Sequence, residues 1–367
     1  RSLMGFLKKD SSLNEKEILA ALNSINDPDL KQDIVRLGSV NNLKINAGKV
    51  TLTIKLTNPA CPIKDQIKME AENIIKKLNG VTDVSVSMDF EVTSQGAGNI
   101  PNMIPKVRNT IAVASGKGGV GKSTIAANLA SALMKCGARV GLMDADVYGP
   151  SIPTLMGDSQ KPQITENRII PPVIHNVKMI SMGYFLPKEE AVIWRGPMLH
   201  KMIQQFLGEV EWGDLDYLVI DLPPGTGDIQ LSLCQTIPLT GAVIVSTPQD
   251  LALQVASKAI AMFRKLKTPI LGLVENMSFY VCSHCGKRDD IFSHGGTLKA
   301  SQELNLPFLG AIPLSTEIRR HSDEGHPTAL TENPYSKAFR SIASSVASQI
   351  SITNYRASNI PSIEISN

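Results

Sequence analysis

The segment from Gly116 to Thr124 carries the clearest chemistry in the sequence. It reads GKGGVGKST and matches the phosphate-loop pattern G-x-x-x-x-G-K-[ST], between an apolar stretch and a helical one. Glycines let backbone N–H groups curl around phosphate oxygens, and the helix that follows adds its positive dipole end. The alternative, a glycine-rich turn without a ligand, fits this context poorly. We therefore predict that ATP and Mg²⁺ bind here, on Gly116, Lys117, Gly118, Gly119, Val120, Gly121, Lys122, Ser123 and Thr124.

Two loop residues and three aspartates are expected to act on the triphosphate. Lys122 is predicted to reach the β- and γ-phosphates, and the Ser123 hydroxyl to ligate Mg²⁺. Asp221 ends an apolar stretch and is predicted to hold Mg²⁺ through water. Asp146 is the candidate for orienting the attacking water, and Asp144 is expected to brace the loop. Each aspartate alone could instead cap a helix, but the three motifs together, in this order, favour an ATP-hydrolysing site.

Lys117 lies inside the loop, five positions before Lys122. If the loop wraps around its own nucleotide, the Lys117 side chain cannot easily reach that nucleotide. It is therefore either a solvated loop lysine or a residue that crosses to the nucleotide of a partner subunit, where it would neutralise transition-state charge as an arginine finger does. The pattern KGGVGK[ST] resembles the deviant Walker A class of ATPases, and this resemblance implies homodimers that enclose their nucleotides between two subunits.

Cys282 and Cys285 form the C-x-x-C pair of the sequence. Two thiolates are half of the four ligands that a closed metal or cluster site needs. A two-fold homodimer would supply all four, and such a set suits a bridging iron–sulfur cluster or zinc. A redox dithiol or a pair without function is the other interpretation. Cys61 precedes a predicted helix whose N-terminus would lower the thiol pKa, so it is an accessory ligand, a transfer thiol or a structural residue.

The elements that must position these residues fall into two groups. In residues 110–350, short continuous apolar runs alternate with helical stretches, as is typical of parallel strands covered on both faces. We predict an α/β fold there, a doubly wound and mostly parallel P-loop NTPase sheet with the C-x-x-C site. Residues 1–93 are predicted to form a small α+β domain. Residues 94–109, rich in Gly, Pro and Asn, are predicted to be a linker, and residues 351–367 a flexible tail.

Composition excludes several classes of protein. The 367 residues are 43% hydrophobic and 19% charged with a net charge of +3, a globular balance that gives no argument for nucleic-acid binding. No run approaches the roughly 18 apolar residues of a membrane span, and the charges at 8–10 and 15–17 interrupt any signal-peptide core. Five cysteines are too few for a disulfide framework. We therefore expect a cytoplasmic protein that binds neither membrane nor nucleic acid.

Further motifs, in order along the chain, indicate a family. They are DADVYGPSIP at 144–153, WRGPM at 194–198, DLPPGTGDIQL at 221–231, STPQDLAL at 246–253 and VENMSFYVCSHCG at 274–286. With these the chain resembles the Mrp/ApbC iron–sulfur cluster carrier ATPases. DPDL, DIVRLG and TNPACP in residues 1–93 resemble the iron–sulfur-assembly domain that is often fused to them.

This resemblance implies a mechanism and partners. It implies a homodimer with a [4Fe–4S] cluster bridged by Cys282 and Cys285, slow ATP hydrolysis, and transfer of the cluster to apo iron–sulfur proteins after loading by a cluster-assembly scaffold. It also places Asn276 at the adenine edge, where a plain turn asparagine is the alternative.

Two other functions are weighed. A positioning ATPase of the MinD/ParA kind would need a basic amphipathic C-terminal helix or a basic stripe, and the final residues ASNIPSIEISN have no basic face. A zinc-bridged ATPase scaffold would hold zinc on the shared cysteines instead of a cluster.

Overall fold

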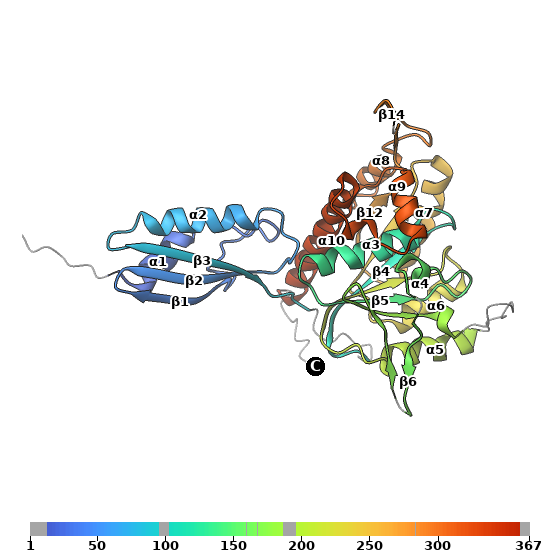
Figure 1. Cartoon of the computed structure of the whole chain (residues 1–367), viewed down its shortest axis with the longest axis horizontal. Helices are drawn as coiled ribbons and strands as arrows, with labels where there is room; N and C mark the ends of the chain where they lie inside the picture. Colours follow the sequence, from blue (N-terminus) through green and yellow to red (C-terminus); the bar gives the residue numbers. More distant parts are fainter. Residues whose placement is uncertain are drawn as a thin grey trace, which may run out of the picture. The chain divides into compact units, whose positions relative to one another are not determined.

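The computed structural model divides the chain into two compact units, Arg1–Glu91 and Val92–Asn367 (Figure 1). The structure describes residues 13–94, 103–158, 160–166, 168–185, 196–282 and 284–359. Half of the expected linker, residues 95–102, and the end of the expected tail, residues 360–367, lie outside the described residues. Each unit is considered by itself.

The described residues of the first unit form a three-stranded sheet with two helices. Its strands lie in the order β1-β2-β3, with β1 and β2 antiparallel and β2 and β3 parallel. Helix α2 connects the parallel pair and buries one face through residues spaced four apart, Ile67, Ala71 and Ile75. The bounds are α1 Glu15–Leu22, β1 Val40–Asn46, β2 Lys49–Leu56, α2 Lys64–Lys76 and β3 Asp83–Phe90.

The second unit contains an eight-stranded sheet in the order β15-β12-β11-β4-β10-β5-β9-β8. All neighbours are parallel except β8, which pairs antiparallel with β9 at one edge. Every residue of β5, β10 and β11 is buried, which requires helices on both faces of the sheet. This confirms the predicted α/β fold with a mostly parallel sheet. The bounds are β4 Val107–Ser115, β5 Val140–Asp144, β8 Val173–Ile174, β9 Val177–Ser181, β10 Leu215–Asp221, β11 Gly241–Ser246, β12 Ile270–Glu275 and β15 Phe308–Ala311.

Helices and two small ladders complete this unit. Helix α3 packs on α10, and α5 packs on α6. The helices are α3 Lys122–Lys135, α4 Ile152–Leu155, α5 Gly196–Gly208, α6 Asp228–Thr236, α7 Asp250–Lys265, α8 Gly296–Glu303, α9 Thr316–Asp323 and α10 Pro334–Ser358, with 3₁₀ turns at Met182–Tyr184 and Thr328–Leu330. The ladders join β6 Gln163–Ile164 to β7 Ile169–Ile170, and β13 Tyr280–Val281 to β14 Arg288–Asp289.

Two expected boundaries need correction. Strand β4 begins at Val107, inside the segment predicted as a linker. Helix α10 continues to Ser358, well into the segment predicted as a tail. Its last turns are ordered because Asn354 is buried and its amide donates to the carbonyl of Thr93 (2.9 Å) and to Oδ1 of Asn109 (3.0 Å). A buried polar side chain of this kind leaves no hydrophobic periodicity in the sequence.

Candidate functional site

The phosphate loop connects the carboxyl end of β4 to the first turn of α3. Gly119 and Gly121 both have φ of +79°, the left-handed region that favours glycine. A Cβ atom at Gly121 would lie 2.1 Å from Nδ2 of Asn276, which itself donates to the carbonyl of Val120 (2.8 Å). The loop is therefore closely packed on Asn276, which follows β12.

Carboxylates lie at the ends of the two strands beside this loop. Asp144 and Asp221 are register partners at the carboxyl ends of β5 and β10. The ammonium of Lys122 lies 2.6 Å from Oδ1 of Asp221 and 3.6 Å from Oδ2 of Asp146. The Ser123 hydroxyl donates to Oδ2 of Asp221 (2.6 Å). The structure thus brings Lys122, Ser123, Asp146 and Asp221 together, and their roles toward ATP and Mg²⁺ stay predictions.

Asp144 holds the loop that follows β5. Its Oδ1 accepts from the N–H of Asp146 (3.1 Å), and its Oδ2 accepts from the Ser181 hydroxyl (2.8 Å) and the N–H of Ile152 (3.2 Å). The side chain is completely buried. Burial, and after it the neighbouring Asp221 carboxylate, raise the pKa of Asp144 to about 7. These contacts tie Asp144 to the loop that follows β5, and its bracing role stays a prediction.

The oxygen set beside Lys122 fits Mg²⁺. Mg²⁺ prefers hard oxygen ligands, and it is usually held by one or two protein groups together with phosphates and waters. The Ser123 hydroxyl and the buried Asp221 carboxylate already lie within hydrogen-bond distance of each other. These two residues could hold the ion next to a bound triphosphate.

Lys117 is half-buried, and its carbonyl accepts from the Ser115 hydroxyl (2.9 Å). Its ammonium forms no ion pair with any residue that the structure describes. That geometry is compatible with both interpretations of Lys117, so the cross-subunit role stays a prediction.

A cavity of about 470 Å³ adjoins the phosphate loop. Its size suits a nucleoside, and its walls are mainly apolar side chains. Asn276 lines it, although its Nδ2 is directed to the Val120 carbonyl, so the expected contact with adenine stays a prediction. The part of the cavity wall formed by residues after β15 was not predicted, because no local sequence pattern links that segment to the phosphate loop. The lining residues are Gly121, Thr124, Asn276, Met277, Tyr280, Ile291, Pro313, Leu314, Ser315, Thr316, Ile318, Arg319 and Ser322.

The cysteine pair lies on a hairpin formed by β13 and β14, the cysteine hairpin. The N–H of Cys282 donates to the carbonyl of Lys287 (2.9 Å), and the N–H of Gly286 donates to the carbonyl of Cys282 (2.9 Å). Backbone N–H groups of Cys285 and His284, followed by the Cys285 thiol, donate to Sγ of Cys282 and lower its pKa. A lowered pKa favours the thiolate, which is the form that binds metal.

One chain supplies only half of a closed metal site. Cys282 is half-buried and Cys285 is exposed. Among the residues that the structure describes, no three side chains of His, Cys, Asp or Glu come close enough together to hold a metal ion. A four-thiolate site therefore needs a second copy of this hairpin.

Cys61 differs from its expected chemistry. The thiol is buried, with 5% of its surface exposed, and burial raises its pKa. The N–H of Ile63 opposes this shift more weakly, and the nearby Asp29 and Asp27 add to it. The predicted lowering by a helix N-terminus is wrong, because desolvation outweighs that effect here.

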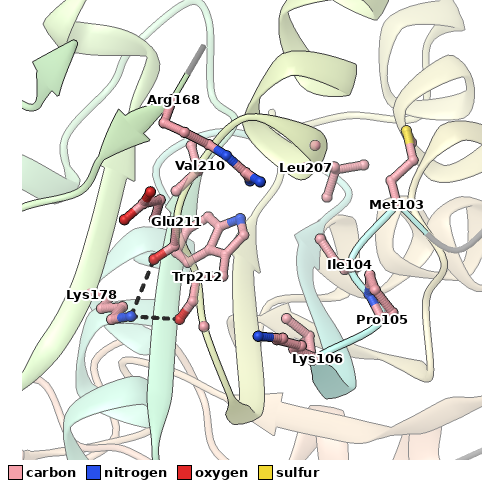
Figure 2. Close-up of a pocket in the computed structure, with 13 residues that line it drawn as sticks. Met103, Ile104, Pro105, Lys106, Arg168, Lys178, Leu207, Val210, Glu211 and Trp212 are labelled. Carbon is pink, nitrogen blue, oxygen red and sulfur yellow. Dashed lines mark hydrogen bonds between the residues drawn. The ribbon is translucent and has the colours of Figure 1, made fainter. Parts of the chain in front are cut away.

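A second cavity, of about 560 Å³, lies at the opposite end of the same sheet (Figure 2). It is lined by Val107, the first residue of β4, and by Gly213, just before β10. Lys178 lines one side of it and donates to the carbonyls of Glu211 (3.1 Å) and Trp212 (2.7 Å). The phosphate loop follows the carboxyl end of β4, so this cavity is separate from the candidate nucleotide site.

A glycine-rich loop between a strand and a helix, with Lys122, Ser123 and carboxylates at neighbouring strand ends, defines a P-loop NTPase. Among the described residues, no helix has the length and apolar character needed to cross a membrane.

Comparison with known proteins identifies the family. Residues 106–347 match the model of the NUBPL iron-transfer P-loop NTPases, and residues 15–116 match that of an iron–sulfur cluster assembly protein. The chain therefore belongs to the NUBPL iron-transfer P-loop NTPase family. Its N-terminal part is an iron–sulfur assembly domain. This confirms the class that the motifs of the sequence indicated.

Individual relatives agree with this assignment. An iron–sulfur cluster carrier protein of Deinococcus radiodurans is 46% identical over 339 residues, which cover 91% of this chain and 95% of the relative. The Escherichia coli iron–sulfur cluster carrier protein is 40% identical over 340 residues, 91% of each chain. The chloroplast Fe–S cluster assembly factor HCF101 of Arabidopsis thaliana is 43% identical over 327 residues, 87% of this chain and 60% of that protein.

A solved structure matches about two thirds of the chain. A nucleotide-binding protein from Archaeoglobus fulgidus, in complex with ADP, has 40% sequence identity and a TM-score of 0.57. The match covers 64% of this chain and 93% of that chain. It supports the α/β nucleotide-binding fold described above.

Proposed function

We propose that this chain is an ATP-dependent iron–sulfur cluster carrier. It works as a homodimer, binds a [4Fe–4S] cluster as cargo on Cys282 and Cys285 of both subunits, and transfers it to apo-proteins. The observation that carries this proposal is the cysteine hairpin, which offers two thiols per chain, one with a lowered pKa, close in sequence to the phosphate-loop contact of Asn276. Membership in an iron-transfer NTPase family supports cluster over zinc.

The phosphate loop performs the ATP step of this proposal. Backbone N–H groups of 116–121 bind the phosphates, and Lys122 exchanges its contacts with Asp221 and Asp146 for the β- and γ-phosphates. Bound Mg²⁺ neutralises charge that develops on the phosphates. Ser123 and Asp221 would hold it.

The other residues orient the reactants. Asp146 orients the attacking water, and Lys117 of one subunit reaches the nucleotide of the other. The base lies in the 470 Å³ cavity, with its edge toward Asn276. The partners are a second copy of the chain, a cluster-assembly scaffold and apo iron–sulfur proteins, with no role for nucleic acid or membrane, in a cytoplasmic location.

Metal analysis of protein purified without oxygen tests this function. Iron and sulfide at about four per dimer are expected, whereas about one zinc per dimer would identify a zinc-bridged scaffold. Cys282→Ala and Cys285→Ala should each abolish cluster binding and leave nucleotide binding unchanged. Cys136→Ala, at the end of α3, is the matched control and should keep the cluster. A stable cluster in Cys282→Ala would reject the site.

A further inference from the structure

The last residue of β12 and the three residues that follow it, residues 275–278, are here called the exit turn. One side of it contacts the phosphate loop, because the Asn276 amide donates to the Val120 carbonyl (2.8 Å) and packs on Gly121. Met277, the next residue, has a φ of +55°, a conformation uncommon for a residue with a side chain. The exit turn is thus held in an unusual backbone shape directly beside the nucleotide site.

Glu275, the first residue of the exit turn, joins the two ends of the segment that carries the cysteine hairpin. Its carboxylate is completely buried. Oε1 accepts from the Ser278 hydroxyl and from the N–H of Gly295 (3.0 Å), and Oε2 accepts from the N–H of Thr297 (2.7 Å). Ser278 precedes the hairpin segment 279–294, while Gly295 is the N-cap of α8 and Thr297 lies in its first turn. One carboxylate therefore caps α8 and fixes the start of the hairpin segment at the same point.

A second set of contacts continues from the exit turn to the hairpin itself. The single hydroxyl proton of Ser278 goes to Glu275, so the serine oxygen accepts from Nδ1–H of His294 at 2.7 Å. The His294 ring meets the edge of Phe279, with centroids 5.8 Å apart. The guanidinium of Arg288, in β14, lies 4.2 Å from the Phe279 centroid. These contacts reach the strand that pairs with β13 next to Cys282.

We propose that the exit turn couples the nucleotide site to the cysteine hairpin, with Glu275 and Ser278 as positioning residues. The inference rests on the proposed function, since it assigns how ATP acts on the cluster. A phosphate in the loop shifts the Val120 carbonyl and with it Asn276. Because Glu275 fixes both ends of segment 279–294, that shift moves the hairpin as one body. Linkage makes the coupling reciprocal, so the bound cluster changes nucleotide affinity by the same factor.

The rate at which a ferrous chelator captures iron from the cluster-loaded, full-length dimer tests the coupling. In the wild-type protein this rate should change about five-fold or more between nucleotide-free and Mg–ADP-saturated protein. In Ser278→Ala the ratio of the two rates should fall to within about two-fold of one. The affinity of the cluster-free variant for Mg–ADP should stay at the wild-type value, because Ser278 does not contact the phosphate loop.

The matched control is Ser301→Ala. It removes another buried hydroxyl, which donates to the Leu298 carbonyl (2.6 Å) within α8, without contacting Glu275. This variant should keep the wild-type ratio. If Ser278→Ala does not fold, His294→Ala removes the same hydrogen bond from a side chain that is 38% exposed.

The outcomes separate this inference from the proposed function. A wild-type dimer that binds no cluster refutes the proposed function. A wild-type dimer that binds the cluster but releases its iron at one rate with and without Mg–ADP refutes the coupling. A wild-type ratio in both Ser278→Ala and His294→Ala also refutes it, because the signal would then bypass the exit turn.

Discussion

One absent methyl group allows the phosphate loop to close on Asn276. Gly121 combines a positive φ with a Cβ position 2.1 Å from the Asn276 amide. Gly121→Ala should therefore lower the free energy of unfolding by about 1–3 kcal/mol and weaken Mg–ADP binding, since the loop must open to make room. Urea unfolding and nucleotide titration measure both effects. Gly208→Ala is the control, because a Cβ there meets nothing within 4 Å. Equal effects of the two substitutions would contradict this account.

The raised pKa of Asp144 gives a second prediction for a single residue. Its pKa is about 7 in the folded chain and near 3.8 when unfolded, so between these values the folded state binds more protons. Stability should then fall as pH rises from about 4 to about 7, by at most about 1.4 kcal/mol per pH unit from this group.

Asp144→Asn cannot titrate and isolates this contribution. Urea unfolding of the nucleotide-free protein at several pH values should show the decline in the wild type and a flatter profile in the variant. Parallel profiles for the two proteins would mean that Asp144 is ionised throughout the range.

From the sequence we could predict which residues lie together at the phosphate site, but not whether a given side chain is buried. Lys122, Ser123, Asp146 and Asp221 are brought together because a motif specifies their spacing and strand ends specify their edge. The direction predicted for the pKa shift of Cys61 is wrong. Burial raises this pKa, and burial depends on how α2 packs over the sheet and not on the local sequence.

At the scale of elements, the C-terminal part of α10 depends on one polar cluster. Asn354 is 1% exposed and donates to acceptors on Thr93 and Asn109. Asn354→Ala leaves Oδ1 of the buried Asn109 without this donor, whereas the Thr93 carbonyl keeps the Asn109 amide (2.8 Å). The unpaired buried oxygen should lower the free energy of unfolding by about 1–3 kcal/mol. Asn359→Ala removes an exposed amide that donates to the Tyr355 carbonyl (2.8 Å), and should have little effect. Urea unfolding compares the two, and indistinguishable midpoints would contradict the role of Asn354.

Elements with hydrophobic periodicity were predictable, and elements held by polar contacts were not. Continuous apolar runs identified β5, β10 and β11, because strands covered on both faces need them. The last turns of α10 and the exit turn depend on Asn354 and Glu275, whose partners are distant in sequence or across a loop. No local pattern identifies such partners.

At the scale of the whole molecule, Lys117 and Lys122 should act in different subunits. In the proposed dimer each site uses its own Lys122 and the partner's Lys117. Lys117→Ala and Lys122→Ala homodimers should therefore both lose ATP hydrolysis. Mixed and re-associated in equal amounts, they should recover about a quarter of the wild-type rate, because half of the dimers are mixed and each has one complete site.

The mixing experiment has a clear contrary result. If Lys117 served the nucleotide of its own chain, neither site of a mixed dimer would be complete, and no activity would return. Mixing Lys122→Ala with Asp221→Ala is the control, because both residues belong to one site and the mixture should stay inactive.

In the proposed carrier, the position of the cysteine hairpin affects how accessible the bound cluster is. Its thiols lie at the tip of a two-stranded ladder, with Cys285 exposed and Cys282 half-buried. Within one chain nothing covers this tip, so in the proposed dimer only the second hairpin would shield a bound cluster. An incoming acceptor thiol can replace the ligands one at a time, and dissolved oxygen has the same access.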